Sequence, residues 1–222
     1  LDRSSAASDV YKRQGMYSFI PGDLDMAAVH SQNFGFDPDS SRQQVDDALC
    51  KLEEANAWDR VEQALTKGVK YLETANPGLM IPDLTVLLVL GDPSNKHFMD
   101  EIRGLSAFGG ISGYIAITIW PTEEVLHRLE AIALHELHHN VRYSPDGIVW
   151  NPQTVTVGEH IVAEGLADLF AAQFYGQRGY THFVTDQTRS REDVLRRVVE
   201  GLDVTGMQDF AAWVLGLSLI HI

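Results

Sequence analysis

Three histidines and a glutamate lie close together in the run His135-Glu-Leu-His-His139. His135 and His139 are four residues apart, so on an α-helix both side chains share one face, about one turn from each other. Two imidazoles placed in this way can each approach one zinc ion at about 2.0–2.1 Å. Glu136 points about 100° away around the helix axis, which suits a carboxylate that contacts the metal's water and not the metal. The spacing therefore predicts a zinc site on a helix.

A catalytic zinc ion takes three protein ligands and keeps one position open, so a third ligand must come from another segment. Glu164 is the best candidate, because a lone carboxylate among small and apolar residues is costly to bury without a partner such as a metal. Asp168, one turn further on, could accept a hydrogen bond from the outer nitrogen of a liganding histidine and fix its tautomer. The alternatives are a solvated helix face for Glu164 and an ordinary exposed acid for Asp168.

The remaining histidines near this pattern have less specific interpretations. His138 faces away from the pair and is expected to be a core or supporting histidine, not a ligand. His160 shares the helix stripe of Glu164 and either lines the cleft or is solvated. The two Glu-x-x-His pairs that end at His127 and His139 occur on one helix, whereas a di-iron bundle needs such pairs on different helices. A di-iron site is therefore disfavoured.

The segments that would position these residues alternate between helical and strand patterns. The helix with the histidine pair is expected from about Glu123 to Val141, with Thr122 as its N-cap. The helix with Glu164 is expected from about Val157 to Tyr175, and Thr156-Val-Gly-Glu159 forms a capping box at its start. Further helices are expected at about 40–57, 58–73, 191–200 and 207–215. The chain breaks after the second of these at Asn76-Pro-Gly78.

Two apolar runs between these helices predict strands. Leu84–Leu90 is nearly continuous in apolar residues and is expected to be a strand buried on both faces. Tyr114–Trp120 is rich in β-branched and aromatic residues and is expected to be a second strand. The glycine-rich stretch 104–113 lies between them.

Composition excludes some classes of partner and compartment. The 222 residues carry a formal net charge of −14, which argues against nucleic-acid binding because affinity for phosphates needs clustered Lys and Arg. No apolar run approaches the roughly 18 residues that span a bilayer. Cys50, the only cysteine, is expected to be a small buried residue of a helix and cannot form an intramolecular disulfide.

Both ends of the chain look foreign to the rest. Residues 1–14 and 217–222 resemble peptides translated from sequencing-adapter DNA, so they are left out of the fold prediction. We expect one domain over residues 15–216, helical to about residue 78, catalytic from 79, and truncated at its C-terminus. A native signal peptide could have been lost, so the expectation of a cytoplasmic protein rests on the lone cysteine.

The pattern of His135-Glu-Leu-His-His139 followed by Glu164-Gly-Leu-Ala-Asp168 resembles the gluzincin metallopeptidases. More narrowly, three runs resemble the DUF2268 family, a bacterial family of predicted Zn-dependent proteases, over roughly residues 80–175. These runs are Gly110-Ile-Ser-Gly-Tyr114, His135-Glu-Leu-His-His-Asn-Val-Arg142 and Ala163-Glu-Gly-Leu-Ala-Asp168. The resemblance implies an α+β, zincin-like fold: a small mixed sheet, the active-site helix, a glutamate-bearing helix after it, and N-terminal helices.

The resemblance also implies an activity and a site. The chain would be a zinc peptidase with one Zn²⁺ per chain, held by His135, His139 and Glu164, with Glu136 as general base and Asp168 beside a ligand. Its partner would be a peptide or protein substrate, paired with strand Tyr114–Trp120 as an edge strand. Other readings are a catalytically silent zinc-stabilised binding or regulatory module, with His160 as a fourth ligand, and a non-peptidase zinc hydrolase. The oxyanion-stabilising residue stays open among Tyr175, Tyr180 and His182.

Overall fold

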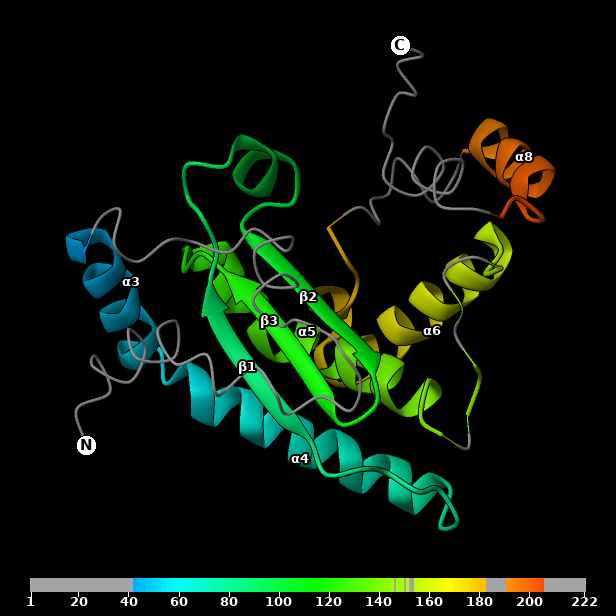
Figure 1. Cartoon of the computed structure of the whole chain (residues 1–222), viewed down its shortest axis with the longest axis horizontal. Coiled ribbons are helices and arrows are strands. Elements are labelled where there is room, and N and C mark those ends of the chain that lie inside the picture. Colours follow the sequence, from blue (N-terminus) through cyan, green and yellow to red (C-terminus); the bar gives the residue numbers. More distant parts are fainter. Residues whose placement is uncertain (1–41, 146, 150, 152–153, 183–190, 206–222) are drawn as a thin grey trace.

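The computed structural model describes residues 42–145, 147–149, 151, 154–182 and 191–205 (Figure 1). The two adapter-like ends and the helix expected at 207–215 lie outside the described residues. Within them the chain is a mixed α and β structure, as expected: a small three-stranded sheet with helices packed against it. No helix of this part of the chain combines the length and the apolar character that crossing a membrane requires.

The sheet has the strand order β1-β3-β2. Strand β1 (Thr85–Leu90) pairs in parallel with β3 (Tyr114–Ile119), and β2 (Leu105–Ile111) pairs antiparallel with β3 from the other side. The register of β2 shifts between Phe108 and Ile111, which marks a bulge in this strand. A short π-helix, η2 (His97–Glu101), lies in the connection from β1 to β2. This topology makes β3 the central strand.

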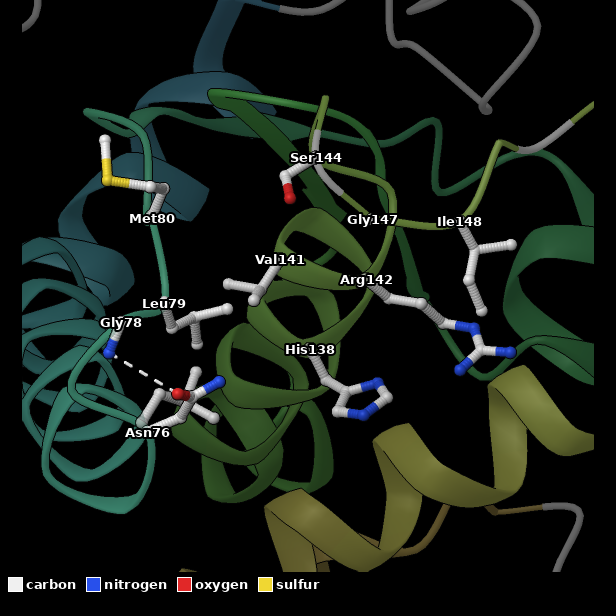
Figure 2. Close-up of a pocket in the computed structure, with 11 residues that line it drawn as sticks. Asn76, Gly78, Leu79, Met80, His138, Val141, Arg142, Ser144, Gly147 and Ile148 are labelled. Carbon is white, nitrogen blue, oxygen red and sulfur yellow. Dashed lines mark hydrogen bonds between the residues drawn. The ribbon is translucent and has the colours of Figure 1, made fainter.

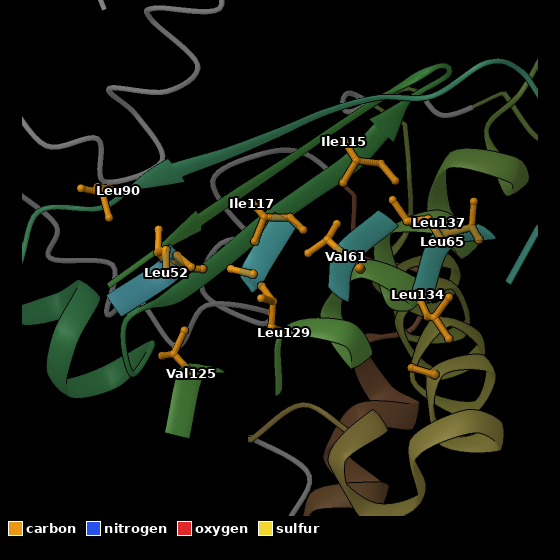
Figure 3. Packing of buried hydrophobic residues seen from close by; sticks show 14 of the residues in the cluster. Leu52, Val61, Leu65, Leu90, Ile115, Ile117, Val125, Leu129, Leu134 and Leu137 are labelled. Atoms are coloured by element: carbon orange, nitrogen blue, oxygen red, sulfur yellow. The ribbon is translucent and has the colours of Figure 1, made fainter. Parts of the chain in front are cut away.

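Helices α4 (Ala57–Ala75) and α5 (Glu123–Arg142) supply most of the helical side of the core (Figures 1 and 3). Ile115, Ile117 and Ile119 alternate along β3 and are at most 1% exposed, so one face of the strand is fully covered. They pack with Leu129 and Leu134 of α5 and with apolar residues of α3 (Arg42–Glu54) and α4. The core therefore holds α5 firmly against the sheet.

The helices that carry the candidate site begin at their predicted capping residues. The Thr122 side chain accepts a hydrogen bond from the Val125 backbone N–H at 3.2 Å, so the N-cap of α5 is confirmed. At the start of α6 (Val157–Tyr175), the Glu159 N–H donates to Thr156 Oγ1 at 3.0 Å. The Thr156 N–H donates to the Glu159 carboxylate at 2.9 Å, which completes the capping box. After α6 come η3 (Gly176–Gly179), a 3₁₀ helix, and α8 (Glu192–Gly201).

Two predictions about the strands were wrong. Leu84–Leu90 was expected to be buried on both faces, but among the described strands β1 lies at an edge of the sheet: Thr85 is exposed, Val86–Val89 are partly buried and only Leu90 of this strand is buried. Tyr114–Trp120 was expected to be an edge strand able to pair with a substrate, but both sides of β3 are occupied by β1 and β2. Within the described residues β2 pairs with β3 only, so its other edge is free, and β2 lies in the glycine-rich stretch where no strand was predicted.

Cys50 is exposed, so the prediction of a buried residue was also wrong. The buried side of α3 is formed by Ala48 and Leu52. Cys50 lies two residues from each of them, about 200° around the helix, and therefore faces outward. The helix was predicted correctly, and its period places Cys50 on the face opposite Ala48 and Leu52.

Candidate metal centre

Helices α5 and α6 bring three potential ligands to one point. His135 and His139 of α5 face each other with their Nε2 atoms 3.0 Å apart. From α6, Glu164 Oε2 lies 3.2 Å from His135 Nε2, and Glu164 Oε1 lies 3.2 Å from His139 Nε2. The two histidines are buried, whereas the Glu164 side chain is 41% exposed, so the group is open on its glutamate side.

This arrangement fits a metal ion. In a tetrahedral zinc site with ligand distances of about 2.0–2.1 Å, neighbouring ligand atoms are about 3.3–3.4 Å apart. The two Nε2 atoms are 3.0 Å apart, and each lies 3.2 Å from one of the two Glu164 carboxylate oxygens, close to that spacing. Two imidazoles and one carboxylate are also a donor set that zinc accepts while keeping one position open. His135, His139 and Glu164 could therefore hold a metal ion.

Asp168 is buried behind His135. It is 5% exposed, and the His135 Nδ1–H donates to its Oδ1 at 2.9 Å. Its other oxygen, Oδ2, accepts from the Thr181 backbone N–H at 3.2 Å and from the Thr181 hydroxyl at 3.4 Å. A carboxylate held in this way fixes the ring orientation of His135 and leaves Nε2 as the atom that faces Glu164 and His139.

The charges of the group are strongly coupled. Burial by itself would lower the pKa of His135, but the hydrogen bonds with Asp168 and Glu164 raise it to about 10. Burial would raise the pKa of Glu164, but the hydrogen bonds with His135 and His139 outweigh it and hold this pKa well below its ordinary value. Without a metal, a proton on His135 is thus stabilised between two carboxylates. A metal ion has to displace that proton to bind.

Glu136 points from α5 toward the bulged strand β2. It is 4% exposed, and the backbone N–H of Gly109 donates a hydrogen bond to it. Burial raises the pKa of the Glu136 carboxyl above its ordinary value, although His135, His139 and the Gly109 N–H each lower it. A Cβ atom at position 109 would lie only 2.3 Å from the Glu136 carbonyl oxygen and 3.0 Å from Oε2. Glycine is therefore required for this close approach.

Asn140, which the sequence interpretation missed, ties α5 to the β2–β3 hairpin. This residue is fully buried, and its Oδ1 accepts from the Gly113 N–H at 2.9 Å. Its Nδ2 donates to the carbonyls of Gly109, Ile111 and Tyr114 at 3.2, 2.7 and 2.8 Å. The signal was present in the sequence, because Asn140 continues the core-facing spacing of Ala133 and Leu137 and a buried amide needs partners.

Two more histidines and one tyrosine lie around the three potential ligands, each in a different environment. His138 is partly buried with its ring 5.9 Å from that of Phe170, and burial lowers its pKa to about 4. His160 Nε2 lies 3.9 Å from Glu164 Oε1, at the margin of the three-residue group. Tyr143, which was not predicted, stacks on His139 with ring centroids 6.0 Å apart and planes at 7°.

Of the three residues considered for oxyanion stabilisation, Tyr175 and His182 have side-chain contacts with other groups, whereas the contact of Tyr180 is made by its backbone. Tyr175 packs near Arg178 and Lys67, and the Tyr180 carbonyl accepts a hydrogen bond from Arg128. The His182 ring nitrogen Nε2 lies 2.9 Å from the Glu101 carbonyl oxygen. None of these contacts places the side chain against His135, His139 or Glu164.

The fold and the site together define a class of protein: an α+β chain with a candidate metal site, formed by two histidines of one helix and a glutamate of the next. Comparison with known families agrees: the model of the DUF2268 family, described as predicted Zn-dependent proteases, matches residues 57–220, and the chain belongs to this family. It is 31% identical over 173 residues to the uncharacterized protein YjfC of Bacillus subtilis (strain 168). That match covers 76% of this chain but 55% of YjfC, so the chain spans about half the length of this relative. No solved structure matches the chain.

Proposed function

We propose that this chain is a zinc-dependent peptidase with a zincin-like fold, and that Zn²⁺ is held by His135, His139 and Glu164. The observation that carries the proposal is the meeting of these three ligand atoms within 4.8 Å of one another, beside a buried glutamate on the same helix. Membership in a family described as predicted Zn-dependent proteases supports the same activity.

The bound zinc would supply a Lewis acid that polarises the peptide carbonyl and lowers the pKa of water. Glu136 acts as the general base: it takes a proton from the attacking water and passes it to the leaving amine. Its raised pKa, caused mainly by burial, makes the protonated state needed for the second transfer easier to reach. Asp168 holds His135 in orientation, and the Gly109 N–H holds the Glu136 carboxylate.

The free edge of β2 is the element best placed to bind the substrate backbone. In the described residues β2 pairs with β3 only, and Gly109 of β2 contacts Glu136. An extended peptide added to this edge would run past the general base, with main-chain hydrogen bonds providing affinity. This role replaces the one expected for β3.

A direct test compares the wild-type protein with the Glu136→Gln and His139→Ala variants on denatured casein, together with metal analysis. Glu136→Gln should keep its zinc and lose hydrolysis by about 10²–10⁴-fold, the contribution expected of a general base. His139→Ala should lose both zinc and activity. Hydrolysis retained by Glu136→Gln would refute the mechanism, and unchanged zinc content in His139→Ala would refute the ligand set.

The alternative of a zinc-stabilised module without activity depends on a fourth protein ligand that closes the site. In the part of the chain that the structure describes, three ligand atoms gather, and His160 is 3.9 Å from Glu164 Oε1 outside that group. The partial exposure of Glu164 further favours an open position. Both observations support the peptidase.

A further inference from the structure

His160 lies at the open edge of the candidate metal group. Its Nε2 atom is 3.9 Å from Glu164 Oε1, the same oxygen that lies 3.2 Å from His139 Nε2. His160 and Glu164 are four residues apart on α6, so they share one face of this helix. The His160 side chain is 25% exposed and that of Glu164 is 41% exposed, so solvent reaches both.

The metal group lies between β2 and α6, with Glu136 and His160 on its two sides. Around α5, Glu136 lies about 100° from His135, on the side of β2. His138 lies about 60° to the other side and points toward α6, where its ring is 5.9 Å from that of Phe170 (Figure 2). A peptide laid along β2 would therefore have Glu136 on one side and His160 of α6 across from it.

The first turns of α6, which carry His160, are held from two directions. The capping box at the start of the helix fixes one side. The Val157 N–H donates to the Val204 carbonyl at 3.0 Å. The Gly158 N–H donates to the Leu202 carbonyl at 2.9 Å, so the chain after α8 fixes the other side. A group that stabilises developing charge has to be positioned in this way before the reaction begins.

Cleavage of a peptide bond needs a donor for the carbonyl oxygen as well as a base for the water. As the water oxygen adds to the carbonyl carbon, Glu136 takes the water proton and the π electrons of the C=O bond move onto the carbonyl oxygen, which becomes negative. The Glu164 carboxylate at the same edge would repel this charge. An imidazole N–H held beside it offsets the repulsion and stabilises the transition state.

Tyr143 also lies near this edge, but its side chain is engaged with other residues of α5 and its C-terminal end. Its ring stacks on His139 with planes at 7°. Its side chain also forms a hydrogen bond with Arg142. The His160 Nε2 atom, in contrast, is directed at the edge of the group itself. His160 is therefore the better donor.

We propose that His160 is a catalytic residue: its Nε2–H donates a hydrogen bond to the carbonyl oxygen of the peptide bond that is cleaved and stabilises the negative charge formed there. This inference rests on the proposed peptidase function. It makes His160 a contact of the substrate and not a fourth metal ligand, in agreement with the group of three ligand atoms formed by His135, His139 and Glu164.

The test compares the wild-type chain with two variants, all loaded with zinc. His160→Phe keeps a planar ring without a donor, whereas the amide of His160→Gln can still donate. On denatured casein, His160→Phe should lower kcat by about 10²–10³-fold with little change in KM, the loss expected for one such donor. His160→Gln should recover at least about tenfold of this loss. Both variants should bind zinc like the wild type.

A binding measurement gives a readout that does not depend on turnover. N-phosphoryl-L-leucinamide carries a tetrahedral, negatively charged group, and N-acetyl-L-leucinamide has a planar, neutral carbonyl in its place. In NMR titrations of the zinc-loaded chain, His160→Phe should weaken the phosphoryl probe by about tenfold or more and leave the acetyl probe nearly unchanged. The control is His97→Phe, an exposed histidine of η2 beside Glu101, which should change neither affinity.

The outcomes separate this inference from the proposed function. Wild-type kcat and probe affinity in His160→Phe would overturn the inference and leave the peptidase proposal standing. Loss of zinc from the His160 variants would make His160 a metal ligand and would also overturn it, as would a loss of kcat in Tyr143→Phe that His160→Phe does not share. His160→Ala, which lacks the donor too, repeats the test if the larger ring prevents folding. A wild-type chain without zinc-dependent hydrolysis would overturn both proposals.

Discussion

At the scale of single residues, His135 is the most constrained member of the metal group. Its two ring nitrogens lie 2.9 Å from Asp168 and 3.2 Å from Glu164, so one side chain contacts both a supporting carboxylate and a potential co-ligand. The ring cannot rotate without losing both contacts. Its tautomer, orientation and proton are therefore set together by residues of α6.

Asp168→Asn should weaken zinc binding by about 10–100-fold, the loss expected when the partner of a liganding histidine is changed. The amide keeps the shape of the carboxylate but removes the charge that orients and polarises His135. Competition with a chromophoric chelator measures the change. Asp100→Asn, at an exposed position of η2, is the matched control and should bind zinc like the wild type. Wild-type affinity in Asp168→Asn would mean that this contact is only structural.

Zinc binding should release a proton from His135 near neutral pH. Because the pKa of His135 is raised to about 10, the metal-free protein carries this proton at pH 7.5, and zinc must displace it. Apparent zinc affinity should therefore rise with pH, by about tenfold per unit below pH 10 for one displaced proton. Titration calorimetry in two buffers of different ionisation enthalpy measures the released proton. A binding heat that is the same in both buffers would contradict the prediction.

At the scale of elements, the position of β2 relative to α5 sets the surroundings of the Glu136 carboxylate. Asn140 fixes this relation, because its side chain bonds to both strands of the β2–β3 hairpin. The bulge between Phe108 and Ile111 brings the backbone of Gly109 against the carboxylate. The Glu136 carboxylate, the proposed general base, is thus oriented by backbone groups that belong to another element.

Asn140→Ala should lower the free energy of unfolding by about 2–4 kcal/mol, because it leaves several buried backbone groups of the hairpin without partners. Chemical denaturation measures the loss. Asn76→Ala serves as control, since the single side-chain bond of Asn76 to the Gly78 N–H is 3.4 Å long and exposed. Its effect should stay within about 0.5 kcal/mol. A similar small effect for Asn140→Ala would show that the hairpin is held by the core alone.

Gly109→Ala should abolish peptidase activity, because the added Cβ would lie 2.3 Å from the Glu136 carbonyl oxygen and force β2 away from α5. Zinc content should be retained, since the ligands lie on α5 and α6. Gly165→Ala is the matched control: it is next to Glu164, yet a Cβ there has no heavy atom within 4 Å. This change should keep activity and stabilise α6 by about 0.5–1 kcal/mol. Full activity in Gly109→Ala would refute the proposed contact.

At the scale of the whole molecule, the candidate metal group spans two helices, α5 and α6, which also share the hydrophobic core through Phe170 and Ala171 of α6. Two of the potential ligands come from α5 and the third comes from α6, which carries exposed apolar residues on its outer side. A metal ion would therefore stabilise the position of α6. The free energy of unfolding should therefore include a contribution from the bound metal ion, in addition to the contributions of the three-stranded sheet and the hydrophobic core.

Zinc should raise the Tm of the metal-free chain, because it binds the folded state through residues that are not assembled in the unfolded one. At free zinc about 1,000 times the Kd, the gain is about 4 kcal/mol. Thermal unfolding followed by circular dichroism measures it. His139→Ala should show little or no shift, and a magnesium salt at the same concentration controls for ionic strength. An equal shift in His139→Ala would place the stabilising zinc elsewhere.

The sequence by itself determined the features that depend on neighbours along the chain. The spacing of His135 and His139 follows from the helical period, and the starts of α5 and α6 follow from Thr122 and Thr156, whose side chains bond within three residues. Glu164 was chosen because a carboxylate among apolar residues needs a partner, and Asp168 because it lies one turn further along the same face of the helix. These are local arguments, and the structure brings all four of the residues that they selected together.

Only the tertiary structure decided which segments meet. Strand β2 was missed because its glycines give little β-propensity, and its stability comes from pairing with β3 and from the bonds of Asn140. The same pairing made β3 central and β1 an edge strand, against both predictions. Strand order and the partners of a buried amide depend on contacts between residues far apart in the chain, which no local pattern specifies. The sequence could therefore indicate the candidate metal ligands, while the surroundings of Glu136 had to come from the fold.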